Sequence, residues 1–132
     1  MADYTIKRVD EMEAVFYDAY KRARASLGVE AFGLAVIDFP PNAHQHPEHD
    51  HTHDGQEEAY VVLSGSGEIE IEGELHRIDP ETMVRVGPDV TRKVWSRDEP
   101  MRLLIISGVP GGVYEPPEVS KLGAPDPAEQ PA

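Results

Sequence analysis

The sequence contains no cysteine. Disulfide bonds are therefore excluded, and thiol usage gives no indication of the redox compartment. No apolar run approaches the roughly 18 residues that a membrane-spanning helix needs. The first residues, MADYTIKRVDEM, lack the apolar centre of a secretory signal peptide. Together these absences predict a cytoplasmic protein that does not enter a membrane.

Basic residues are also scarce. The chain has 12 Lys and Arg against 25 Asp and Glu, which gives a net charge of -13 at pH 7. Proteins that bind nucleic acid usually present a basic face, because the duplex carries a dense negative charge. The composition therefore predicts no nucleic-acid partner, and the acidity is interpreted as favouring solubility.

The length of 132 residues corresponds to one domain. In its first part, residues 1–30, the pattern is that of an amphipathic helix after a short lead-in. Asp10 suits an N-cap, Glu13 follows at the capping-box spacing, and Gly28 suits the position after the last turn. Apolar residues between them recur at steps of three and four. We expect one N-terminal α-helix that packs on the outside of a sheet.

Short apolar or alternating stretches, separated by Gly, Pro and Asp turns, fill residues 31–115. This pattern predicts a mainly β domain, with antiparallel strands in a sandwich or barrel. The expected strands are 32–39, 60–63, 68–72, 75–78, 83–86, 90–95 and 101–107. Residues 116–132 are rich in proline and poor in large apolar side chains, which predicts a flexible tail.

Histidine is concentrated in one place. Five of the 6 histidines, at positions 44, 46, 49, 51 and 53, precede the adjacent carboxylates Glu57 and Glu58. Imidazole and carboxylate together are ligands for divalent metals such as Zn, Fe, Mn or Ni. Extended backbone places residues i and i+2 on the same side, so a His-x-His pair directs two imidazoles one way. We therefore expect a divalent-metal site here.

The spacing His51-x-His53, four residues, Glu58, six residues, Gly65 resembles the first motif of the cupins. This resemblance implies a jelly-roll-like cupin β-barrel, with a metal held inside it by His51, His53 and Glu58. A second register remains open, because His49-x-His51 is also a His-x-His pair. His51 belongs to both registers.

The second cupin motif is matched by Val86 to Arg92, but Arg92 stands where the family has a histidine ligand. A guanidinium remains protonated and does not bind metal. A fourth ligand would then come from His44, His46 or His49, or from water. Arg92 is a candidate to clamp an anionic substrate, with Tyr60 lining the cavity. In the alternative interpretation no metal is bound, and Arg92 pairs with Glu58.

Two functional hypotheses follow. In the first, a metal-binding cupin binds or acts on a small polar or anionic molecule. In the second, the barrel is a metal-free module that binds a small ligand or has a structural role. Neither the reaction type nor whether the protein is an enzyme follows from these residues. The resemblance and the apolar stripe of the expected helix also predict a homodimer.

Overall fold

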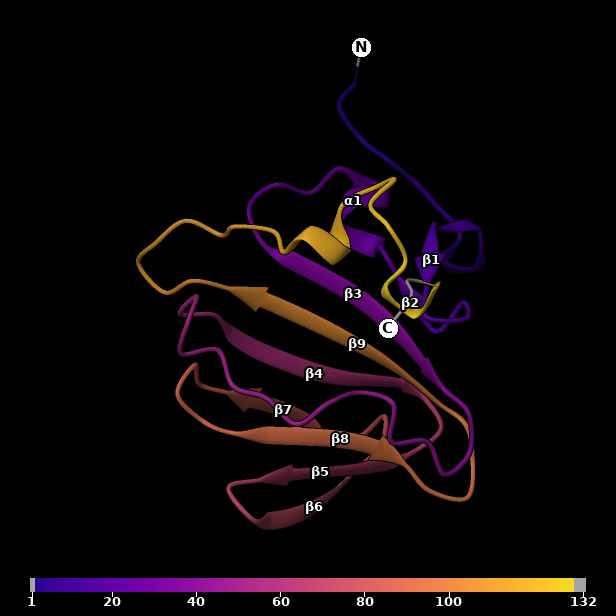
Figure 1. Cartoon of the computed structure of the whole chain (residues 1–132), viewed down its shortest axis with the longest axis vertical. Helices are drawn as coiled ribbons and strands as arrows, with labels where there is room; N and C mark the ends of the chain where they lie inside the picture. Colours follow the sequence, from indigo (N-terminus) through magenta and orange to yellow (C-terminus); the bar gives the residue numbers. More distant parts are fainter. Residues whose placement is uncertain (1, 130–132) are drawn as a thin grey trace.

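Two antiparallel β-sheets form the body of the molecule (Figure 1), in a computed structural model that describes residues 2–129. The larger sheet has the strand order β1-β2-β3-β9-β4-β7, and the smaller has the order β6-β5-β8. The strands of the larger sheet are β1 (Ala14–Val15), β2 (Tyr20–Lys21), β3 (Gly33–Phe39), β4 (Glu57–Ser64), β7 (Met83–Val86) and β9 (Met101–Gly108). Those of the smaller sheet are β5 (Gly67–Ile71), β6 (Glu74–Ile78) and β8 (Arg92–Ser96). The predicted antiparallel strands are thus confirmed.

The hydrophobic core lies between the two sheets. Side chains from β3, β4, β7 and β9 meet those of Ile69, Ile78 and Val94, which come from the three strands of the smaller sheet. Alternation places every second residue of β4 in this core, and Glu58, Tyr60 and Val62 are its buried positions. The core-facing side of β4 therefore carries a carboxylate and a phenol among its apolar neighbours.

The sheets do not join into the closed barrel that the resemblance implies. Closure beside β8 would need ladder hydrogen bonds from the chain that follows β3. Pro40 and Pro41 lack the backbone N–H for such bonds and end β3. The chain beyond them forms no continuous ladder with β8: it makes an isolated bridge between His49 and Arg92, and the carbonyl of Ala43 accepts from the N–H of Ser96 at 3.2 Å. The observed architecture is therefore two packed sheets with the histidine segment along one edge.

The N-terminal helix predicted to follow Asp10 is not confirmed. A 3-10 turn, η1 (Val9–Glu11), is followed by the β1–β2 hairpin, and α1 is limited to Ala23–Leu27. Phe16, Tyr17 and Asp18 have φ values of 57°, 56° and 69°, which a right-handed helix cannot contain. Pairing of β2 with β3 satisfies the backbone instead. Gly28 does end α1 in the left-handed conformation, with φ 79°.

The Pro-rich tail lies against the N-terminal segment as far as it is described. The guanidinium of the buried Arg22 donates from Nε to the carbonyl of Val119 at 2.7 Å and from Nη2 to that of Ala124 at 2.9 Å. The Asp126 carboxylate accepts from the N–H of Phe16 at 3.1 Å. Two 3-10 turns, η2 (Glu118–Ser120) and η3 (Pro127–Glu129), shape this segment. The flexibility expected of the tail stays a prediction.

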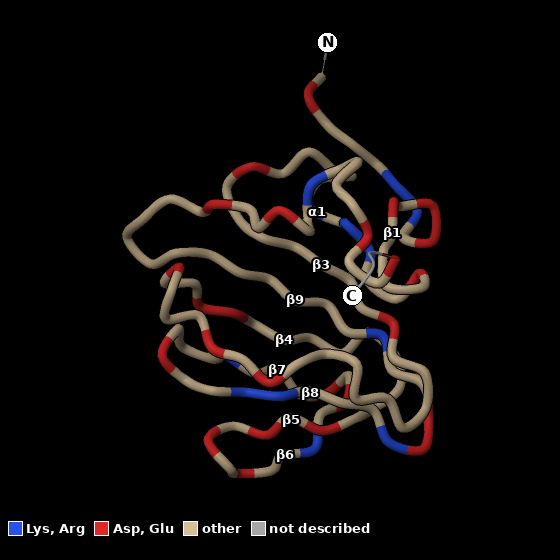
Figure 2. Tube along the Cα trace, viewed as in Figure 1, with Lys and Arg blue, Asp and Glu red and all other residues tan. Residues whose placement is uncertain are grey.

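Charged residues occur both in turns and along the strands. Figure 2 shows acidic residues spread over the molecule, with Lys and Arg interspersed among them. Several of these are paired across strands, as in the contact of 2.9 Å between Arg85 of β7 and Glu57 of β4. None of the helices in residues 2–129 has the length and hydropathy of a membrane span.

The turn after β4 gives a test of backbone strain. Gly65 has φ +76°, and a Cβ there would collide with the backbone carbonyl oxygen of Pro100. We expect Gly65→Ala to lower the free energy of unfolding by about 2–5 kcal/mol, because strain and overpacking add. Gly73 is the matched control: its φ is +82°, but a Cβ would meet nothing within 4 Å. Gly73→Ala should cost only about 1–2 kcal/mol. If urea unfolding showed that the two variants lose equal free energy of unfolding, the collision at Gly65 would be contradicted.

Candidate metal centre

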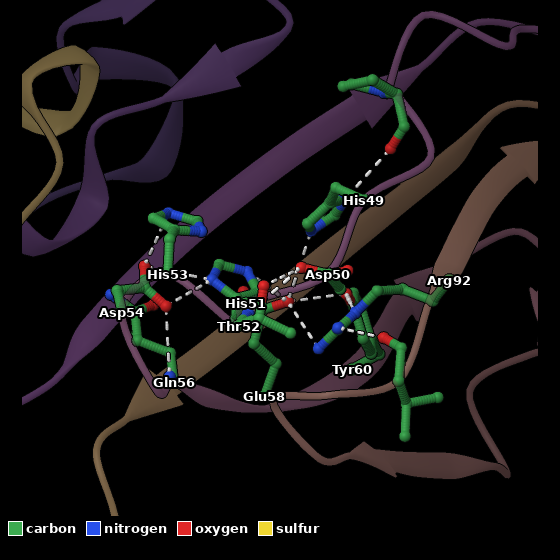
Figure 3. Close-up of polar contacts among 12 residues, drawn as sticks. His49, Asp50, His51, Thr52, His53, Asp54, Gln56, Glu58, Tyr60 and Arg92 are labelled. Carbon is green, nitrogen blue, oxygen red and sulfur yellow. Dashed lines mark hydrogen bonds and ion pairs between the residues drawn. The ribbon is translucent and has the colours of Figure 1, made fainter.

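The histidine segment is extended because it pairs with β8 and with the turn before it. The N–H of His49 donates to the carbonyl of Arg92 at 3.0 Å, and the N–H of Arg92 donates back at 2.9 Å. Two residues on, the N–H of His51 donates to the carbonyl of Pro88 at 2.8 Å. This extended backbone turns the imidazoles of His49 and His51 to the same side, toward β4 (Figure 3).

The extended conformation ends at His51. A turn follows, in which the N–H of Gly55 donates to the carbonyl of His51 at 2.8 Å and Gly55 has φ 72°. The turn carries the side chain of His53 outward, where it is 73% exposed. The structure therefore brings His49, His51 and Glu58 together, with one potential ligand atom of each within 4.8 Å of the others. His53 lies outside this group.

Glu58 is the centre of the site. Its side chain is 9% exposed, and its Oε1 accepts a hydrogen bond of 2.7 Å from the hydroxyl of Tyr60. The same oxygen lies 3.3 Å from Nε2 of His51 and 3.7 Å from Nε2 of His49. On its other side is Nη2 of Arg92, at 3.5 Å. One carboxylate oxygen thus faces two imidazoles, a phenol and a guanidinium.

The other ring nitrogen of each imidazole is already engaged. Nδ1 of His49 lies 3.0 Å from the carbonyl oxygen of Pro47, and Nδ1 of His51 lies 3.0 Å from Oδ1 of Asp54. A carbonyl and a carboxylate only accept, so each Nδ1 carries the hydrogen. In the neutral rings both Nε2 lone pairs then point toward the Glu58 carboxylate. Nε2 of His51 is buried and has no hydrogen-bond partner.

This arrangement requires a positive charge between the rings and the carboxylate. Two lone pairs directed at a carboxylate repel it, and a proton or a metal ion removes the repulsion. A hydrogen bond from a ligand histidine's second nitrogen to an acceptor is also the usual support for metal-binding imidazole. The donor set of two imidazoles and one carboxylate suits borderline divalent metals. The residues present therefore fit a metal ion.

Arg92 and Tyr60 lie beneath Glu58 and are almost completely buried, at 0% and 1% exposure. Nε of Arg92 donates to the Tyr60 hydroxyl at 3.2 Å, and Nη1 donates to the carbonyl of Val90 at 2.6 Å. Nη2 has no hydrogen-bond partner and faces Glu58. The ion pair that the sequence left as an alternative is thus present. Direct contact of Arg92 and Tyr60 with a substrate stays a prediction.

The surroundings shift the pKa values of the site. Burial alone raises the pKa of Glu58, but His49, His51 and Tyr60 outweigh it, so this pKa lies well below its usual range. The facing Glu58 carboxylate raises the pKa of His51. Burial, followed by the nearby His49, lowers the pKa of His46 to about 4. Glu58 is therefore ionised at neutral pH, and His46 is neutral.

Two contributions to the site were not found from the sequence. Asp54 orients His51 from three residues along the chain, and the carbonyl of Pro47 orients His49. An Asp that precedes a Gly at a turn is a common pattern, so its spacing from His51 was the only available signal. The carbonyl of Pro47 gives no sequence signal, because every residue has one.

Comparison with known proteins agrees with the two-sheet fold. The family model of the cupin domain matches residues 35–107, and the chain therefore belongs to the cupin domain family. No curated protein matches the chain.

Several solved structures are similar to the chain. A cupin protein from Bacteroides fragilis is 25% identical, with a TM-score of 0.69, and the match covers 89% of this chain and 93% of that one. The cupin domain of an XRE family transcriptional regulator from Enterobacter cloacae is also 25% identical, with a TM-score of 0.54, over 63% of this chain and 86% of that chain. A sugar phosphate isomerase of the cupin superfamily from Silicibacter pomeroyi shares the fold, with a TM-score of 0.58 and 21% identity. That match covers 67% of this chain and 57% of the isomerase chain.

The pairing of Glu58 with Arg92 predicts a non-additive effect of mutation. Glu58→Leu leaves the buried guanidinium of Arg92 without its counter-charge, and should cost about 3–5 kcal/mol of unfolding free energy. Adding Arg92→Met removes the stranded charge and should recover at least half of that loss. Urea unfolding in a chelator, which keeps metal out of the comparison, measures both variants. If the losses of unfolding free energy from the two substitutions simply added, the stabilising effects of Glu58 and Arg92 would be independent of each other.

Proposed function

We propose that this protein is a metal-binding cupin that holds one divalent ion through His49, His51 and Glu58 and binds a small polar or anionic molecule beside it. The supporting observation is the pair of Nε2 atoms directed at the Glu58 carboxylate, at 3.7 and 3.3 Å, while each Nδ1 is held by an acceptor. The orphaned, buried Nε2 of His51 is the atom that most needs a cation. In the metal-free protein a proton takes that role.

Three protein ligands leave coordination positions for water or a ligand. A bound metal would supply Lewis acidity to an oxygen of that ligand. The chain contributes the rest of the site: Asp54 and Pro47 hold the two rings, and Tyr60 orients Glu58. Arg92 adds a permanent positive charge next to the carboxylate. This charge favours an anionic ligand such as a carboxylate or phosphate.

The ion pair of Arg92 with Glu58 supports a second candidate function, a metal-free module that binds small anions. Arg92 is fully buried and already supplies the counter-charge at 3.5 Å. In this case His51 is protonated and completes the neutralisation of Glu58. The two candidates differ in the metal content of the untagged protein, and in whether metal changes its stability.

Metal binding can be tested with untagged protein. We expect about one equivalent of Zn²⁺ or Co²⁺ by elemental analysis, and a stabilisation of about 2.7 kcal/mol at a free concentration of 100 times Kd. His51→Ala should weaken binding by at least about 100-fold, since even residues that only orient a ligand are worth about 10–100-fold. His76→Ala, on the exposed surface of β6, is the control and should bind normally. A protein with no bound metal, whose melting temperature metal does not change, would favour the metal-free module.

The stabilisation by metal should depend on pH. The raised pKa of His51 means that its protonated form stabilises the metal-free fold below about pH 6.5. This contribution is lost as pH rises through the pKa of the folded state. Glu58, with its lowered pKa, and His46, which titrates at about 4, add little change above pH 6.5. Thermal melts should therefore show a larger Zn²⁺-induced shift at pH 8 than at pH 6.5. A shift that shrinks with pH would contradict a metal at His51.

A further inference from the structure

A second group of potential ligands lies on the solvent side of His51. His51, His53 and Asp54 each offer one potential ligand atom, and these atoms lie within 4.8 Å of one another. Asp54 is in contact with both rings, at 3.0 Å from His51 Nδ1 and 3.3 Å from His53 Nε2. The two rings are stacked, with centroids 5.8 Å apart and planes inclined by 21°. Figure 3 shows this group beside the inner one.

His51 belongs to both groups through different nitrogens. Its Nε2 faces Glu58, and its Nδ1 faces Asp54. A neutral imidazole has one nitrogen with a hydrogen and one with a lone pair. If Nδ1 keeps its hydrogen, Nε2 is free to bind an ion on the inner side. If the hydrogen moves to Nε2, it faces Oε1 of Glu58 at 3.3 Å, and Nδ1 becomes free to bind an ion on the outer side.

The exposure of these side chains falls in order from the surface to the centre. The side chain of His53 is 73% exposed, Asp54 26%, His51 14% and Glu58 9%. His53 extends furthest into solvent, whereas His49 of the inner group is 26% exposed, so the outer group presents the larger exposed surface to a hydrated cation. The net charge of -13 also raises the concentration of cations near the surface. The outer group is therefore the more accessible of two neighbouring groups that share His51.

We propose that His51 Nδ1, His53 Nε2 and the Asp54 carboxylate form an outer divalent-metal site, which captures the ion before it reaches His49, His51 and Glu58. The role in capture rests on the proposed function of the inner site. Because a neutral His51 serves one side at a time, the two sites are occupied alternately and total binding is one equivalent. A shift of the ring hydrogen from Nε2 back to Nδ1 accompanies transfer inward, so the ring remains neutral throughout.

Equilibrium binding of Zn²⁺ to variants tests the outer site directly. His49→Ala removes an inner ligand and should leave about one equivalent of weaker binding at the outer group. Adding His53→Ala should lower this residual affinity at least 10-fold. Adding His44→Ala instead is the matched control, since the His44 ring stacks on Trp95, with centroids 5.3 Å apart, away from both groups. Circular dichroism checks that each variant keeps its fold.

Rates provide a second measurement that leaves the inner ligands intact. In stopped-flow mixing with Co²⁺, His53→Ala should reduce the association rate constant several-fold, and His44→Ala should not change it. The outer site would be overturned if the residual Zn²⁺ affinity of His49→Ala did not change on adding His53→Ala. It would also be overturned if wild type, His53→Ala and His44→Ala had equal association rate constants for Co²⁺. Wild-type affinity in His49→Ala would instead overturn the inner site, so the two failures are distinguishable.

Discussion

The buried carboxylate of Glu58 sets the constraint on which the rest of the site depends. It lies on the core-facing side of β4, where an isolated negative charge would be costly. Its Oε1 is contacted by four polar side chains, those of Tyr60, Arg92, His49 and His51. Each of these groups is held in turn by a further acceptor or by strand pairing. The polar network is therefore continuous from β8, across β4, to the histidine segment.

Much of this architecture could be predicted from the chain alone. Strands β3 to β9 follow from alternating side chains and from turns rich in Gly, Pro and Asp, which are local signals. Glu58 and His51 could also be chosen as site residues from the motif spacing, because His51 belongs to both possible His-x-His registers. The choice between His49 and His53 does not follow. It depends on where the extended segment ends, and that is set by the pairing of His49 with Arg92, far along the chain.

The N-terminal segment shows the same limit. Its apolar residues recur at steps of three and four, which suits a helix, but pairing of Lys21 with Val36 in β3 determines its conformation. Lys21 is 2% exposed, and its ammonium group contacts the carboxylates of Asp18 and Asp38 at 3.0 and 3.6 Å. A tertiary contact thus overrides local helix propensity. The prediction of a closed barrel was wrong for a different reason: Pro40 and Pro41 interrupt the backbone hydrogen bonds that closure requires.

Arg22 links the two ends of the described chain. Its guanidinium is buried and donates hydrogen bonds to the backbone carbonyls of Val119 and Ala124, while its Nη1 lies 3.4 Å from the carboxylate of Glu13. Substitutions at these two tail positions can therefore preserve the contact, whereas a deletion that removes the segment cannot. A chain shortened before Val119 would expose a cation with two unmet donors. The identity of these two tail residues can therefore vary during evolution, whereas loss of the segment that carries them would leave the Arg22 donors without these acceptors.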